Sequence, residues 1–267
     1  MHSQSIDLQA ADGQQFPAWV ATPEGPPRGA IVVLQEIFGV NPHIRAVTER
    51  FAARGYLAVA PALFTRVQPL VELGYSAEDM QAGMALKAAV EQLPGAGVLP
   101  DIQAAIDYAQ GRSGTKVVAV GFCWGGLLAW RAACTLQGLA GVACYYGGGM
   151  TSAPEMARQP RCPVLAHFGR HDHWIALDSV QAFSRAHPDV AVHVYEADHG
   201  FNCDQRASYD EATSIAARDL TLAFFDPCLA SRRAAWRLAM TVRPRPPVRH
   251  WPRAPHLPRT RPRYRLR

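Results

Sequence analysis

The sequence lacks the features that mark several classes of protein. Its six cysteines include no C-x-x-C pair, so we expect neither a zinc site nor a dithiol redox motif. No apolar run reaches the ~18 residues that span a membrane, and residues 1–16 show no basic segment followed by an apolar run. We therefore expect no signal peptide, no membrane association and a cytoplasmic protein with reduced thiols.

Acidic residues are absent from residues 231–267, which hold twelve arginines and seven prolines. Residues 1–230 then carry fifteen basic and 22 acidic residues, a net charge of −7. We predict a folded domain over residues 1–229 and a disordered Arg/Pro-rich tail over 230–267, because like charge and proline oppose both helix and core. The tail is either a phosphate-binding segment for nucleic acid or a non-selected extension. We favour the extension, and so expect no nucleic-acid partner.

Short apolar runs alternate with helix-like segments along the first 229 residues. Such runs are typical of parallel strands buried on both faces. The pattern predicts one doubly wound, mostly parallel α/β domain, with its site beyond the carboxyl ends of the strands. The predicted strands are 30–35, 57–60, 116–120, 141–145, 163–168 and 190–195, and the predicted helices are 43–54, 77–92, 100–112, 125–136, 178–186 and 207–225.

The candidate nucleophile is Cys123. Strand 116–120 runs into GFCWGG at 121–126 and then into an apolar helix, which is the G-x-S-x-G pattern with cysteine in place of serine. Glycines flank such a turn because a Cβ there strikes the neighbouring strand or helix. The helix N-terminus favours a thiolate at Cys123 and points the N–H of Trp124 at a developing oxyanion. The alternative is a tight turn around a structural cysteine.

The order of the remaining residues predicts the partners of the nucleophile. In this kind of fold the nucleophile is followed by an acid and then by a histidine, each on a loop after a later strand. Asp172 comes four residues after strand 163–168, and His199 lies in the loop after strand 190–195. We therefore predict a triad of Cys123, Asp172 and His199.

Four other residues compete for these roles. Asp178 opens a predicted helix, where an aspartate is typical of an N-cap. Asp198 adjoins the histidine in sequence, and adjacent loop side chains seldom face each other. His171 and His173 precede the position at which the fold supplies its base. We expect structural or solvated roles for all four.

The predicted triad implies a covalent mechanism. His199 converts Cys123 to a thiolate while Asp172 fixes the imidazole tautomer. The thiolate attacks an ester or lactone carbonyl, and water later hydrolyses the thioester. Backbone N–H groups of Trp124 and Ile37 bind the oxyanion. The chemistry needs no metal and no organic cofactor, and we expect a monomer acting on a small molecule.

Several motifs together resemble the dienelactone hydrolases (carboxymethylenebutenolidases), which have the α/β-hydrolase fold. They are QEIFG at 35–39, PALF at 61–64, GFCWGG at 121–126, the turn at 169–172 and HGF at 199–201. The similarity covers about residues 5–228. It implies that Glu36 approaches the thiol and controls its ionisation; the alternative is a solvated carboxylate at the end of a strand.

The resemblance also bears on the substrate. In the family, arginines grip the carboxylate of the substrate, and Arg206 is one candidate, but residues 70–93 contain no arginine and only Lys87. True dienelactone or a related ester or lactone both remain open. The alternatives are a general carboxylesterase of different acyl preference, which apolar Phe38 and Phe64 suit, and a binding protein that keeps the fold without the chemistry.

Overall fold

An eight-stranded sheet organises the part of the chain that the computed structural model describes, residues 1–230. Its order is β1-β2-β4-β3-β5-β6-β7-β8. The pairs β1–β2 and β2–β4 are antiparallel and all the others are parallel. The strands are β1 His2–Gln9, β2 Gln15–Thr22, β3 Gly29–Leu34, β4 Tyr56–Pro61, β5 Val117–Phe122, β6 Leu139–Tyr145, β7 Val164–Gly169 and β8 Ala191–Tyr195.

Every residue of β3, β4, β5 and β7 is buried. This burial explains why these strands read as continuous apolar runs in the sequence. All six predicted strands are present, and their predicted ends lie within two residues of the observed ends. β1 and β2 were not predicted; they form an antiparallel hairpin at one edge of the sheet, and β1 is largely exposed.

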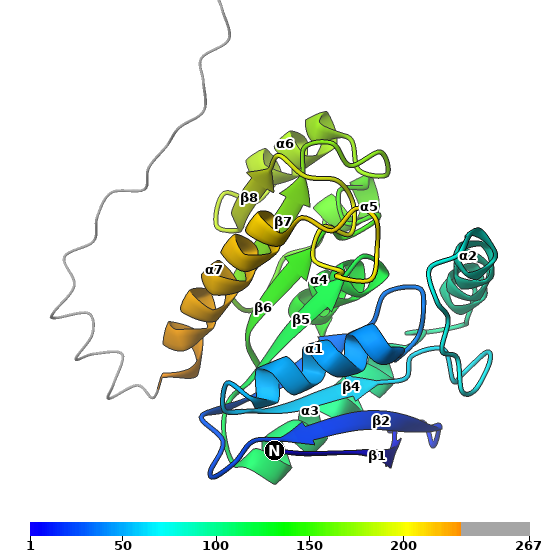
Figure 1. Ribbon diagram of the computed structural model, residues 1–267, viewed down its shortest axis with the longest axis vertical. Coiled ribbons are helices and arrows are strands. Elements are labelled where there is room, and N and C mark those ends of the chain that lie inside the picture. The colour runs from blue at the N-terminus through cyan, green and yellow to red at the C-terminus, as the bar shows by residue number, and fades with distance from the viewer. Residues whose placement is uncertain (231–267) are drawn as a thin grey trace, which may run out of the picture. The chain divides into compact units, whose positions relative to one another are not determined.

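Helices cover both faces of the sheet. α1 and α7 pack on one face and α3 and α4 on the other (Figure 1). This confirms the predicted doubly wound, mostly parallel sheet. The helices are α1 Pro42–Ala52, α2 Ala77–Glu91, α3 Leu99–Ser113, α4 Trp124–Thr135, α5 Ala153–Met156, α6 Leu177–Ala186 and α7 Glu211–Leu229.

One predicted helix start and one predicted N-cap are wrong. The last helix begins at Glu211 instead of residue 207, because the Asp210 side chain accepts a hydrogen bond from the Thr213 backbone N–H at 2.7 Å and caps the helix there. The N-cap of α6 is Ala176, so Asp178 lies within the first turn and caps nothing. A carboxylate in that turn still interacts favourably with the helix dipole.

The last described helix, α7, ends at Leu229, and the compact unit runs from Met1 to Ala230. The predicted tail over 230–267 lies, from residue 231, outside the described residues. Among residues 1–230, no helix combines the length and the apolar character needed to cross a membrane.

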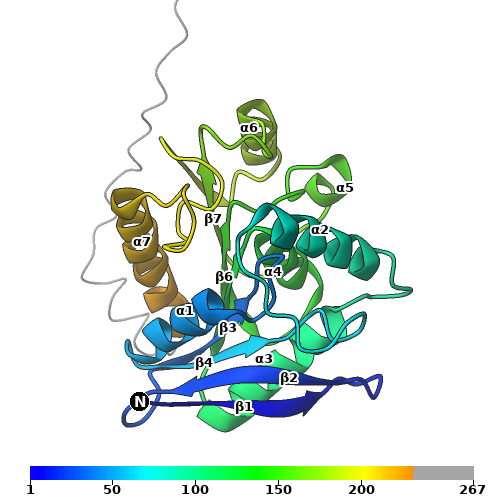
Figure 2. The ribbon, with the colours of Figure 1, turned by 45° about the vertical axis from the view of Figure 1, so that its right-hand side comes forward.

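The parallel strands deliver their carboxyl ends to one edge of the sheet. The loops after β3, β5, β7 and β8 start there, and α2 stands over α4 near the same edge (Figure 2). Ligand sites of open α/β sheets form at this edge. The four loops carry Glu36, Cys123, Asp172 and His199 respectively.

Candidate active site

Cys123 lies at a strained turn between β5 and α4. Its φ of 54° and ψ of −117° place a side-chain-bearing residue in a region that glycine favours, at a cost of about 1–3 kcal/mol. A Cβ on Gly121 would collide with the carbonyl oxygen of Gly125, and one on Gly125 would collide with that of Leu34. The Cys123 N–H donates to the Tyr145 carbonyl oxygen at 3.0 Å. The fold therefore enforces the strained turn.

His199 and Asp172 form a buried hydrogen-bonded pair. The Nδ1 atom of His199 lies 2.7 Å from Oδ2 of Asp172, and these residues are 7% and 6% exposed. The other oxygen, Oδ1, accepts hydrogen bonds from the backbone N–H groups of Trp174 at 2.8 Å and Ile175 at 3.1 Å. The backbone thus fixes the carboxylate through Oδ1, and Oδ2 orients the imidazole.

The electrostatics of His199 favour a protonated ring. Burial alone disfavours the charged imidazolium. The nearby Cys123 sulfur and the hydrogen-bonded Asp172 carboxylate outweigh the burial and raise the pKa of His199 to about 10. The arrangement therefore favours a protonated His199 ring between Asp172 and Cys123.

Among the competing acids and bases, Asp198 and His171 have partners other than the His199 ring. The Oδ1 atom of Asp198 accepts the backbone N–H of His199 at 2.6 Å, so this carboxylate holds the backbone and not the ring. The Nε2 atom of His171 lies 3.1 Å from Oε2 of Glu196 on the surface. His173 is exposed.

Glu36 is fully buried, so the alternative of a solvated carboxylate is wrong. Its Oε1 atom lies 3.6 Å from Nη1 of Arg206, and its Oε2 accepts a hydrogen bond from the Tyr75 hydroxyl at 3.4 Å. The guanidinium carbon of Arg206 lies 5.9 Å from the Phe38 ring centroid. Although burial opposes its charge, the pKa of Arg206 is raised, chiefly by Glu36.

A pocket of about 160 Å³ brings most of the predicted residues together. Cys123 and His199 line it with four other predicted residues: Ile37, Phe38, Trp124 and Arg206. Trp124 is the first residue of α4, so its backbone N–H has no partner within the helix and is free to bind an oxyanion.

The structure adds residues that the sequence did not indicate. Met80, Met84 and Lys87 from α2 line the pocket, as does Trp174, which is 66% exposed. The sequence predicted α2 but gave no sign of which face meets the site. The helix carries few buried residues, so it has no clear apolar stripe to set its orientation.

Phe64 differs from its expected place. It is fully buried and stacks on the Trp124 indole, with ring centroids 5.0 Å apart and planes 7° from parallel. The Trp124 Nε1–H donates to Oε1 of Glu91 at 2.9 Å. Phe64 thus lies behind the pocket wall and supports the ring that forms it.

The sheet order, the strand-to-helix turn with its cysteine and the later His199–Asp172 pair define an α/β-hydrolase. The chain belongs to the dienelactone hydrolase family, whose profile matches residues 16–229, and it is a hydrolase. The carboxymethylenebutenolidase of Pseudomonas putida is 34% identical over 235 residues, covering 85% of this chain and 98% of that protein.

Two further comparisons agree with this assignment. A relative from Synechocystis sp. is 40% identical over 203 residues, covering 70% of this chain and 81% of that protein. A crystal structure from Klebsiella pneumoniae is 30% identical and superposes with a TM-score of 0.69, covering 84% of this chain and 99% of the other.

Proposed function

We propose that the protein is a cysteine hydrolase that cleaves a small ester or lactone through a thioester intermediate. Cys123 acts as nucleophile, His199 as general base and acid, and Asp172 as the group that orients the imidazole. The observation that carries this proposal is the buried 2.7 Å hydrogen bond between His199 and Asp172, with His199 and Cys123 lining one pocket. Residues 1–229 form the proposed catalytic domain.

The reaction follows from the positions of these groups. The Cys123 thiolate attacks the carbonyl carbon, and the backbone N–H groups of Trp124 and Ile37 bind the oxyanion that forms. The protonated His199 gives its proton to the leaving alcohol oxygen, which leaves an acyl thioester on Cys123. The neutral imidazole then takes a proton from water, and the resulting hydroxide hydrolyses the thioester and restores the thiol.

Glu36 tunes the nucleophile in this proposal. A buried carboxylate beside the pocket disfavours a resting thiolate by like-charge repulsion, while Arg206 offsets part of its charge. An anionic substrate that pairs with Arg206 would change this balance. The thiol then ionises fully only when substrate is present, which limits its oxidation between turnovers.

The pocket suggests a substrate that is small and carries a negative charge. Its volume of about 160 Å³ limits the size. Arg206 and Lys87 both line the pocket, so Lys87 supplies a second positive charge in the segment that lacks arginine. The apolar side chains of Met80, Met84 and Trp174 favour a second candidate, a general carboxylesterase that takes neutral esters.

Hydrolysis of dienelactone and of p-nitrophenyl acetate tests the proposal. The wild type is compared with Cys123→Ala and with Cys162→Ala, a control at a free cysteine outside the pocket, and each protein is checked for folding by circular dichroism. We expect turnover by the wild type and the control only. Efficient cleavage of dienelactone supports the anionic substrate class, cleavage of the simple ester alone supports the carboxylesterase, and full activity in Cys123→Ala overturns the triad. Cytoplasmic location and a monomeric state stay predictions.

A further inference from the structure

Helix α2 lines the pocket although few of its own residues are buried. Met80, Met84 and Lys87 line the pocket, and their spacing of four and three residues places them on one face of the helix. The buried residues of α2 are Gly83 and Val90. Since burial alone holds this helix weakly, the contacts at its two ends decide where the lining face lies.

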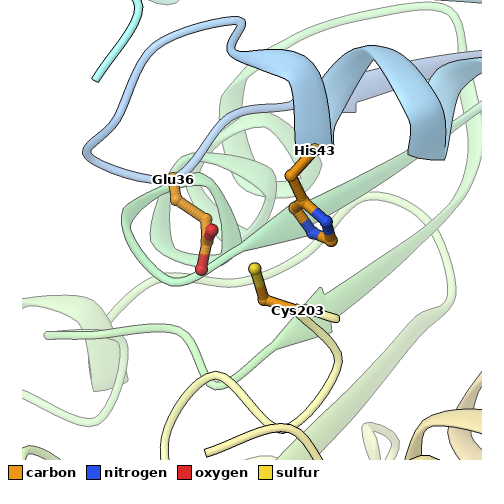
Figure 3. A group of neighbouring side chains, drawn as sticks. All are labelled: Glu36, His43 and Cys203. Carbon is orange, nitrogen blue, oxygen red and sulfur yellow. The ribbon is translucent and has the colours of Figure 1, made fainter. Parts of the chain in front are cut away.

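The start of α2 is attached to Glu36. Tyr75, two residues before the helix, donates a hydrogen bond from its hydroxyl to Oε2 of Glu36 at 3.4 Å. Figure 3 shows the buried side chains of His43 and Cys203 pointing toward this carboxylate. The first end of α2 is therefore tied to a group that the core encloses.

The end of α2 is attached to α4. Glu91 is the last residue of α2, and its Oε1 accepts the indole N–H of Trp124 at 2.9 Å. Nη1 of Arg131 donates to Oε1 at 3.1 Å and to Oε2 at 2.9 Å. Trp124 and Arg131 are seven residues apart, so they lie two turns apart on one face of α4, over which α2 stands (Figure 2). Burial opposes the charge of Glu91, but these hydrogen bonds lower its pKa.

Arg131 is itself held in a fixed orientation. Its Nε donates to Oε1 of Glu155 at 2.8 Å, and Nε of Arg158 donates to Oε2 of the same carboxylate at 2.7 Å. The side chains of Arg131 and Glu155 are 22% and 4% exposed, so solvent and salt screen this ion pair less than one on the open surface. The Arg131 guanidinium thus lies between two carboxylates, one of which is nearly buried.

Lys87 lies one turn before Glu91 on the same face of α2. Residues four apart on a helix are neighbours, so Glu91 is the expected partner of the Lys87 ammonium within the helix. In residues 1–230 the ion pair of Glu91 goes to Arg131 instead, and Lys87 lines the pocket. We propose that Arg131, by holding Glu91, positions Lys87 for the negative charge of an anionic substrate. This inference rests on the proposed function.

The test compares 4-acetoxybenzoate, an ester that carries a carboxylate, with its neutral methyl ester, by release of the phenol. In Arg131→Met the Glu91 carboxylate is left to pair with Lys87, so kcat/KM for the charged ester should fall roughly tenfold. The value for the neutral ester should change much less. Adding Glu91→Gln to Arg131→Met should restore most of the loss, because the amide carries no charge and its oxygen still accepts the Trp124 indole N–H. A merely structural role predicts the opposite, a second loss that adds to the first.

Two further variants sharpen the reading. In the Lys87→Met background, Arg131→Met should cause no further loss with the charged ester. Arg112→Met, at an exposed cation in α3, is the matched control and should behave like the wild type. Should Arg131→Met fail to fold by circular dichroism, Arg131→Gln takes its place, since its amide can donate to Glu91 without offsetting the charge. Equal losses with both esters, or no recovery when Glu91→Gln is added, overturn the inference.

Binding of 4-hydroxybenzoate, the product anion, separates this inference from the proposed hydrolysis. Calorimetry should show a Kd raised roughly tenfold in Arg131→Met and recovered when Glu91→Gln is added. If the wild type cleaves neither ester but this binding pattern is found, the proposed function fails and the role of Arg131 stands. Absence of binding to the wild type, or an unchanged Kd in folded Arg131→Met, overturns that role.

Discussion

Asp172 divides its two carboxylate oxygens between His199 and the backbone of its own loop. Oδ2 lies 2.7 Å from Nδ1 of His199, while Oδ1 accepts the N–H groups of Trp174 and Ile175. A carboxylate held in this way fixes the position of the ring and places the proton on Nδ1. The second ring nitrogen is then free to exchange a proton with Cys123.

Replacing Asp172 by asparagine should lower kcat by about 10⁴-fold, because an amide that donates its N–H to Nδ1 stabilises the wrong imidazole tautomer. The variant Asp178→Asn, in the first turn of α6, is the control and should keep its activity. Ester hydrolysis by both variants is measured at the same pH. Activity equal to that of the wild type in Asp172→Asn would exclude this carboxylate from the mechanism.

The raised pKa of His199 predicts a pH-dependent contribution to stability. The ring is protonated up to about pH 10 in the folded state, against an ordinary value of 6.5. Its contribution to stability is therefore complete below pH 6.5 and is lost as the pH rises through 10. The free energy of unfolding of the wild type minus that of His199→Gln should decrease between pH 6 and pH 10. Urea denaturation at several pH values measures it, and a constant difference would refute the shift.

Two glycine substitutions, one at the strained turn and one in α3, should have opposite effects on stability. Gly121→Ala should destabilise the fold by several kcal/mol, since its Cβ would collide with the backbone of Gly125 and shift the nucleophile. Gly111→Ala should stabilise it by about 0.5–1 kcal/mol, because this position is in α3 and a Cβ there meets open space. Thermal denaturation compares the two. Equal effects would mean that the turn is less tightly packed than described.

Lys87 should matter for anionic substrates only. Lys87→Met is expected to lower kcat/KM for an ester carrying a carboxylate by roughly tenfold, or ~1.4 kcal/mol of binding, and to leave a neutral ester nearly unchanged. Arg112→Met, at an exposed cation in α3, is the control. An equal fall in kcat/KM for both esters would indicate that Lys87 shapes the pocket without pairing with the charge of the substrate.

The sequence predicted the parallel strands better than the antiparallel hairpin of β1 and β2 at one edge of the sheet. β3, β4 and β5 are buried on both faces, so their composition alone separates them from loops. β1 has the sequence HSQSIDLQ and is only partly buried. Its polar residues face solvent, and its pairing with β2 depends on contacts that composition does not reveal. The four-residue α5 is too short to leave a periodic pattern.

Some of the site residues could be placed from the sequence, and others could not. Cys123, Asp172 and His199 could be placed because chain order and strand ends determine which loops meet. Phe64 was misplaced because its position behind Trp124 is set by ring stacking. Lys87 reaches the pocket only through the packing of α2. No local pattern in the sequence marks which face of that helix meets the site.

Trapping the acyl-enzyme tests the central claim most directly. Wild type and Cys123→Ala are mixed with p-nitrophenyl acetate, quenched with acid within the first turnover and digested for peptide mass spectrometry. We predict one acetyl group on the peptide that contains Cys123 in the wild type, together with a burst of p-nitrophenol, and neither in Cys123→Ala. Acetyl transfer to another residue, with turnover retained in Cys123→Ala, would contradict the account.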